Sequence, residues 1–121
     1  VVAFGVNGVE YFAHPWEVGP RKAKEMLFTG DWLSAEDARQ LGMVNHVVPK
    51  DELRTFVMAM AEKIAQKPAF GLKLAKESVN QALEAQGQWT ALRAAFSLQH
   101  LAHANNRLKF GIPIDPGYKK P

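Results

Sequence analysis

The 121-residue sequence predicts a mostly α-helical chain. Long segments place apolar side chains three, four and seven residues apart, which is the spacing of one face of an α-helix. Proline and glycine stand at the borders of these segments, where they commonly begin and end helices. Only one run, residues 43–48, is short and β-branched enough to predict a strand.

The chain is expected to begin with an irregular segment followed by a helix. Residues 1–18 are rich in aromatic side chains and are punctuated by glycine and proline, which predicts loops and short turns. Gly19 and Pro20 are expected to open a helix over residues 21–29, because proline is favoured at the first helical position. Gly30 is expected to end that helix in the left-handed conformation.

The next predicted elements are a short helix and a strand. Ser34, with Asp37 three residues later, resembles a capping box and predicts a helix that ends at Gly42. The strand predicted at residues 43–48 is closed by Pro49. A single strand cannot satisfy its own backbone hydrogen bonds, so this prediction implies that part of the fold lies outside the chain.

Three longer helices are predicted at residues 51–66, 69–85 and 88–106, followed by a tail. The first two carry apolar stripes that we expect to be core or subunit interface: Leu53, Phe56, Val57, Met60 and Ile64, then Leu72, Ala75, Val79, Ala82 and Leu83. Trp89 and Phe96 on the third helix could anchor such an interface. The tail, residues 111–121, has three prolines and two glycines, which predicts an extended or disordered segment unless a partner orders it.

Composition excludes several classes of protein. The 15 basic residues are interspersed with 12 acidic ones, for a net charge of +3, so we expect no nucleic-acid partner. The absence of cysteine excludes a disulfide scaffold and fits a reducing compartment, and we expect a cytoplasmic protein. No apolar run approaches the roughly 20 residues of a membrane span. The sequence begins without Met, which suggests a fragment.

Three ordered blocks of the sequence resemble one known family. They are Arg21-Lys22-Ala23-Lys24-Glu25-Met26-Leu27-Phe28-Thr29-Gly30, then Leu33-Ser34-Ala35-Glu36-Asp37-Ala38, then Leu41-Gly42-Met43-Val44-Asn45-His46-Val47-Val48-Pro49. Further on, Leu74-Ala75-Lys76-Glu77-Ser78-Val79-Asn80 is similar to a later helix of that family. The family is the crotonase superfamily, the enoyl-CoA hydratase/isomerase group.

The resemblance implies a fold and an activity. The chain would be the C-terminal helical part of an α/β crotonase fold, a superhelix of ββα turns. Residues 1–18 would be a remnant of the core and active-site loop, residues 19–106 a helical oligomerisation region and residues 107–121 a tail. The family binds acyl-CoA thioesters, assembles as trimers or dimers of trimers, and stabilises an enolate-like oxyanion with two backbone N–H groups. It implies no metal and no cofactor beyond the CoA of the substrate.

The candidate site residues are Glu10 and His14, because both lie in the loop where the family places its active-site wall. The family's glutamates have no counterpart here: one lies upstream, and the segment aligned with the other is Val1-Val2-Ala3-Phe4-Gly5, without a carboxylate. Aromatic neighbours could raise the pKa of Glu10 by desolvation. His14 could titrate near neutral pH. The alternative for Glu10 is a solvated loop carboxylate, and a histidine before proline in an aromatic loop, as His14 is, is more often structural.

The predicted function is that of part of an enoyl-CoA hydratase or isomerase. The segment alone is expected to be inactive, since the oxyanion-hole donors would lie upstream. Two alternatives remain: a crotonase-fold hydrolase or dehydratase, and a non-catalytic helical oligomerisation module. His100 and His103 share a helix face, but zinc needs three or four ligands and no carboxylate stands at matching spacing, so we expect packing there and no metal.

Overall fold

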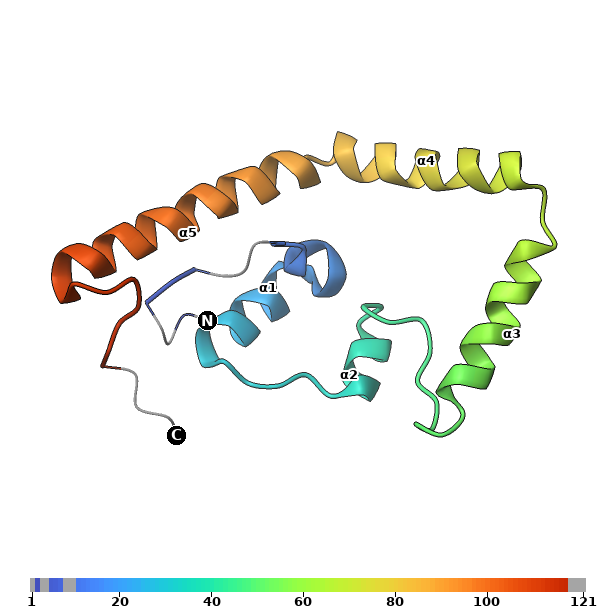
Figure 1. Cartoon of the computed structure of the whole chain (residues 1–121), viewed down its shortest axis with the longest axis horizontal. Coiled ribbons are helices and arrows are strands. Elements are labelled where there is room, and N and C mark those ends of the chain that lie inside the picture. The colour runs from blue at the N-terminus through green and yellow to red at the C-terminus, as the bar shows by residue number, and fades with distance from the viewer. Residues whose placement is uncertain (1, 3–4, 8–10, 118–121) are drawn as a thin grey trace.

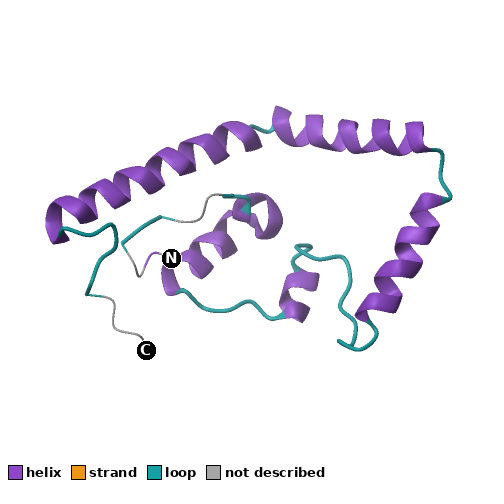
Figure 2. Ribbon diagram, in the orientation of Figure 1, coloured by secondary structure: helices purple, strands orange, loops and turns teal. Residues whose placement is uncertain are grey.

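The computed structural model describes residue 2, residues 5–7 and residues 11–117 of the chain. In chain order its helices are α1 (His14–Thr29), α2 (Ala35–Gln40), α3 (Leu53–Ala65), α4 (Ala69–Ala85) and α5 (Gln88–Phe110). Figure 2 shows helices and loops but no strand among the described residues. The mostly α prediction is therefore confirmed for the part of the chain that the structure describes.

The helices form an open arc. Figure 1 shows α3, α4 and α5 following one another along the outside, with α1 and α2 lying inside the curve. The accessible surface of the chain is 9679 Å². A compact protein of 13.4 kDa would expose about 6,500 Å². The chain therefore leaves uncovered a large area that a compact domain of its size would bury.

The first helix starts earlier than the sequence predicted. Helical residues begin at His14, and Gly19 interrupts them with a non-helical conformation, φ 74° and ψ 158°. Such a positive φ is readily adopted by glycine, because other residues would bring Cβ too close to the backbone. Pro20 then starts the second helical stretch, where its missing N–H is not needed. The sequence signal at Pro20 was correct, but the preceding turn of helix was missed.

The predicted helix caps are largely confirmed. The Ser34 hydroxyl oxygen accepts a hydrogen bond from the Asp37 backbone N–H at 3.0 Å, as in a capping box. Gly30 ends α1 in the left-handed conformation with φ 77°, and its N–H donates to the Met26 carbonyl. Gly87, with φ 80°, separates α4 from α5. The last helix continues beyond the expected Asn106 and ends at Phe110.

The strand predicted at residues 43–48 is wrong. These residues form turns and irregular backbone and have no strand neighbour among the described residues. The backbone N–H groups of Met43 and Val44 both donate to the Ala38 carbonyl, at 2.9 and 3.3 Å. They therefore satisfy the C-terminal end of α2, where carbonyls lack helical partners. The β-branched composition of residues 43–48 favours a strand, but the hydrogen bonds that cap α2 hold the first of these residues in another conformation.

The small buried core of the described residues is contributed by the N-terminal segment, α1, α2 and α5. Its apolar members are Val6, Ala13, Val18, Ala23, Ala38, Leu92 and Ala95. Asn106 of α5 is only 2% exposed, and its side-chain N–H group donates to the carbonyls of Gly5 and Pro113. His103 donates through Nδ1 to the same Pro113 carbonyl at 2.7 Å. The described part of the tail is thus held against α5 by hydrogen bonds.

The apolar stripes of α3 and α4 are not part of this core, since neither helix has a buried residue. Leu53 and Val57 of α3 are each 51% exposed, and Val79 of α4 is 61% exposed. Apolar side chains at helical spacing normally face a packed neighbour. The apolar stripes of α3 and α4 were expected to form either the internal core or a subunit interface. The described residues exclude the internal core, and the subunit interface stays a prediction.

Candidate functional site

His14 is the described member of the predicted site pair, and Glu10 lies outside the described residues. His14 is the first residue of α1 and is half-buried. Its ring lies beside that of Phe12, with centroids 5.2 Å apart and planes tilted by 54°. The side chain is therefore held in an aromatic wall at the point where the loop becomes helix.

One ring nitrogen of His14 is buried without a hydrogen bond. Nδ1 has no hydrogen-bond partner among the described residues, although it is shielded from solvent. A buried polar atom without a partner costs about 1–3 kcal/mol, and such atoms often mark a site that a ligand or water completes. An imidazole nitrogen can accept or donate a hydrogen, depending on the tautomer. His14 thus has the chemistry and the unsatisfied atom expected of a proton-transfer group.

A cavity of about 350 Å³ adjoins His14. Its lining residues are Tyr11, Ala13, His14, Glu17, Val18, Met26 and Met43. Glu17 stands one helical turn after His14, so an imidazole and a carboxylate border the same space. We call this space the histidine cavity. Glu17 is exposed, and its place beside His14 follows from the unexpected first turn of α1.

A smaller hollow lies against another part of His14. It measures about 220 Å³ and is lined by His14, Met26, Leu27, Gly30, Asp31 and Trp32. Trp32 is 99% exposed in the chain. His14 and Met26 border both spaces, so they form the wall between the histidine cavity and this hollow.

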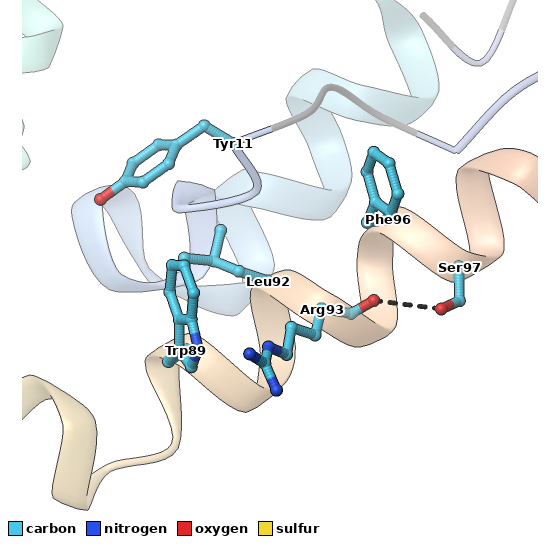
Figure 3. A pocket seen from close by; sticks show the side chains of 6 residues that line it. All are labelled: Tyr11, Trp89, Leu92, Arg93, Phe96 and Ser97. Atoms are coloured by element: carbon cyan, nitrogen blue, oxygen red, sulfur yellow. Dashed lines mark hydrogen bonds between the residues drawn. The ribbon is translucent and has the colours of Figure 1, made fainter.

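A third space, which we call the aromatic cavity, lies between the N-terminal loop and α5 (Figure 3). It measures about 440 Å³ and is lined by Tyr11, Trp89, Leu92, Arg93, Phe96 and Ser97. Tyr11 also lines the histidine cavity, so one side chain borders both spaces. Residues 89, 92, 93 and 96 are three and four apart, and this periodicity was the sequence signal that could have revealed the aromatic cavity.

The other histidines do not join this site. His100 and His103 lie with their ring centroids 6.4 Å apart on α5, and His46 packs edge-on against Phe56 at 5.1 Å. Within the described ranges, no cluster of three or more His, Cys, Asp or Glu side chains is arranged to hold a metal ion. Nor does any described helix combine the length and apolarity needed to cross a membrane.

Comparison with known proteins gives a consistent result. EchA13 of Mycobacterium tuberculosis, whose name places it among the enoyl-CoA hydratases, is 50% identical over 101 residues, which are 84% of this chain and 32% of that protein. The crystal structure of a probable enoyl-CoA hydratase from Mycobacterium thermoresistibile superposes with a TM-score of 0.92 at 46% identity, covering 95% of this chain and 47% of that one. An enoyl-CoA hydratase/isomerase from Xanthobacter autotrophicus Py2 superposes with a TM-score of 0.76 at 31% identity, covering 91% of this chain and 45% of that one.

The chain thus spans between a third and a half of the length of these relatives. The match extends through the irregular segment before α1 as well as through the helices. The family described as enoyl-CoA hydratase/isomerase matches residues 6–114, which include every described helix and the residues that line the histidine and aromatic cavities. The chain therefore belongs to the enoyl-CoA hydratase/isomerase family.

Proposed function

We propose that this chain forms the helical part of an acyl-CoA enzyme that adds water across, or moves, the double bond of an enoyl-CoA. The family match over residues 6–114 is the observation that carries the proposal. CoA arrives as part of the substrate, and the proposal needs no other cofactor. A cytoplasmic location stays a prediction.

We further propose that His14 exchanges a proton with the bound acyl group. Support comes from the buried Nδ1 without a partner and from the adjoining histidine cavity. A general acid or base must stand within hydrogen-bond reach of the proton that it moves, and histidine is the side chain that most often takes that role. Glu17 borders the same cavity and could exchange the proton with the imidazole. Glu10 stays a second candidate on sequence grounds.

The exposed stripes of α3 and α4 support an assembly of several copies, and we propose the trimer that the family resemblance implies. The surface that the chain leaves uncovered exceeds the roughly 1,600 Å² that a standard protein interface buries. Obligate interfaces are larger and more apolar than this standard. Sedimentation of the chain tests the proposal, because a monomer at all concentrations would contradict self-association through these helices.

The proposed activity can be tested in a chimera. In the Mycobacterium thermoresistibile protein, the region that superposes on this chain would be replaced by residues 1–121. We expect the chimera to hydrate crotonyl-CoA, whereas residues 1–121 alone should not. A folded, assembled chimera that turns over no enoyl-CoA would contradict the proposed function. Robust hydration by the 121-residue chain would contradict only the prediction that it is inactive alone.

His14 is tested in the same chimera against a matched histidine. His14→Asn should lower kcat by at least about 100-fold, the lower end of the range for general acid–base groups, with a smaller change in KM. His46→Asn changes a histidine that packs against Phe56, outside the cavities, and should leave kcat within about twofold. An equal loss in the two variants would show that the His14 effect is structural. An unchanged kcat in His14→Asn would remove His14 from the mechanism.

A further inference from the structure

The aromatic cavity combines apolar walls with a single cation. Trp89, Leu92 and Phe96 come from one face of α5, and Tyr11 of the N-terminal loop lines the same space (Figure 3). Its volume of about 440 Å³ falls within the range of small-molecule sites. Among the described residues that line it, Arg93 alone carries a formal charge. These features suit a ligand with an apolar body and one anionic group.

Arg93 is positioned by the cavity wall. The centre of its guanidinium group lies 5.5 Å from the centroid of the Trp89 ring, in a cation–π arrangement. The ion pairs among described residues join Lys22 to Glu25 and Arg39 to Glu36, and neither involves Arg93. A guanidinium group presents several N–H donors in one plane and binds carboxylates through two parallel hydrogen bonds.

Ser97 cannot donate a hydrogen bond to an anion in this cavity, which leaves Arg93 as the charged donor. Its hydroxyl donates to the Arg93 backbone carbonyl at 3.2 Å, as Figure 3 shows. The hydroxyl hydrogen is therefore committed to the helix backbone, and the Ser97 oxygen offers a ligand only an acceptor. A carboxylate in this cavity would depend on Arg93 for charge-assisted hydrogen bonds.

We propose that the aromatic cavity receives the far end of an acyl group and that Arg93 selects acyl groups ending in a carboxylate. Tyr11 borders both this cavity and the histidine cavity, so an acyl group beside His14 could extend past Tyr11 toward Arg93. The assignment of an acyl ligand rests on the proposed function. The preference for an apolar anion rests on the lining residues alone.

Direct binding tests the preference without any enzyme turnover. Naphthalene-2-carboxylate and its neutral analogue naphthalene-2-carboxamide would be titrated into the 121-residue chain by calorimetry. The carboxylate should bind at least about tenfold more tightly, since a hydrogen bond to a charged group contributes more than one to a neutral group. Equal affinities, or no binding of the carboxylate, would overturn the proposal.

Matched arginine variants assign the effect to one residue. Arg93→Met should weaken carboxylate binding by about tenfold or more and leave carboxamide binding within about twofold. Arg107→Met removes another cation of α5, one that lines a different pocket, and should change neither affinity. Circular dichroism would check that both variants keep their helices. Parallel weakening of the two ligands in Arg93→Met would show that Arg93 supports the wall and does not bind the anion.

The chimera separates this proposal from the proposed function. With decenedioyl-CoA, a substrate ending in a carboxylate, Arg93→Met should lower kcat/KM by about tenfold or more, while turnover of decenoyl-CoA should change by less than about twofold. Turnover of both substrates with no Arg93 effect would overturn the selectivity proposal and leave the proposed function intact. Failure to turn over either substrate would overturn the proposed function, and the binding experiment would still decide the role of Arg93.

Discussion

Asn106 offers the sharpest test of how the chain is held together. It is 2% exposed, and its Nδ2 donates to the Gly5 carbonyl at 3.1 Å and to the Pro113 carbonyl at 3.2 Å. One side chain therefore joins the N-terminal segment, α5 and the tail. Asn106→Asp replaces this donor with a carboxylate while keeping the size of the side chain.

The expected loss can be worked out from these contacts. A shielded acceptor left without a donor costs about 1–3 kcal/mol, and this applies to the Gly5 carbonyl, since the Pro113 carbonyl keeps its hydrogen bond from His103. Burying a carboxylate beside carbonyl oxygens adds to this, and it also raises the pKa of the introduced carboxyl group. We expect the free energy of unfolding to fall by at least about 2 kcal/mol at neutral pH. Since small domains are stable by about 5–15 kcal/mol, this change should be readily measured.

Urea denaturation followed by circular dichroism provides the measurement, and Asn105→Asp provides the control. Asn105 is the preceding residue on the same helix and is exposed, so the same substitution should change stability by less than about 0.5 kcal/mol. Folding raises the pKa of the carboxyl group introduced at position 106 above its unfolded value of about 3.9. The carboxyl group therefore stabilises the folded state when it is protonated at low pH, and this stabilisation is lost as pH rises. The deficit of Asn106→Asp should therefore shrink near pH 4. Equal destabilisation by the two variants would refute the reasoning.

Three further predictions concern glycine, a helix cap and an ion pair. Gly5→Ala should lower the free energy of unfolding by about 1–2 kcal/mol, because Gly5 has φ 70° and a Cβ there would lie 2.9 Å from the Asn106 side chain. In the same urea experiment, Gly71→Ala should raise the free energy of unfolding by about 0.5–1 kcal/mol, because a Cβ at this position of α4 would point into open space. Ser34→Ala should cost about 1 kcal/mol in urea denaturation by removing the cap of α2. Hydrogen bonds from Arg39 lower the pKa of Glu36. The stabilisation from this pair is therefore present above the unfolded pKa of about 4.3 and is lost as pH falls through the lower folded pKa. Arg39→Gln should raise the pKa of Glu36 in an NMR titration, and an unchanged pKa would contradict the assigned cause.

Helices were the most predictable part of the fold. Ser34 and Gly30 act as helix caps where the sequence placed them, because a cap depends on a side chain and backbone only a few residues away. The errors occurred where a distant or competing contact mattered. Residues 43–48 have strand composition, yet their first N–H groups cap α2. The first turn of α1 was missed because Gly19 breaks the helical pattern in the middle.

The candidate site was predictable only in part. His14 was chosen because of its place in an aromatic loop, and the structure adds a buried Nδ1 and an adjoining cavity. A role for Glu10 stays a prediction outside the described residues. Periodicity could have grouped Trp89, Arg93 and Phe96 on one helix face, but it could not have shown that Tyr11 lies opposite them.

The sequence by itself determined the helical segments, most of their ends and the family, because these depend on side-chain spacing and on hydrogen bonds between near neighbours. Only the tertiary structure decided that the stripes of α3 and α4 stay exposed and that Tyr11 meets α5. The same holds for Asn106, which links Gly5 to Pro113. These features depend on how residues far apart in the sequence are brought together in the fold. Local propensity contains no information on that arrangement, since a helix face has the same sequence pattern whichever surface covers it.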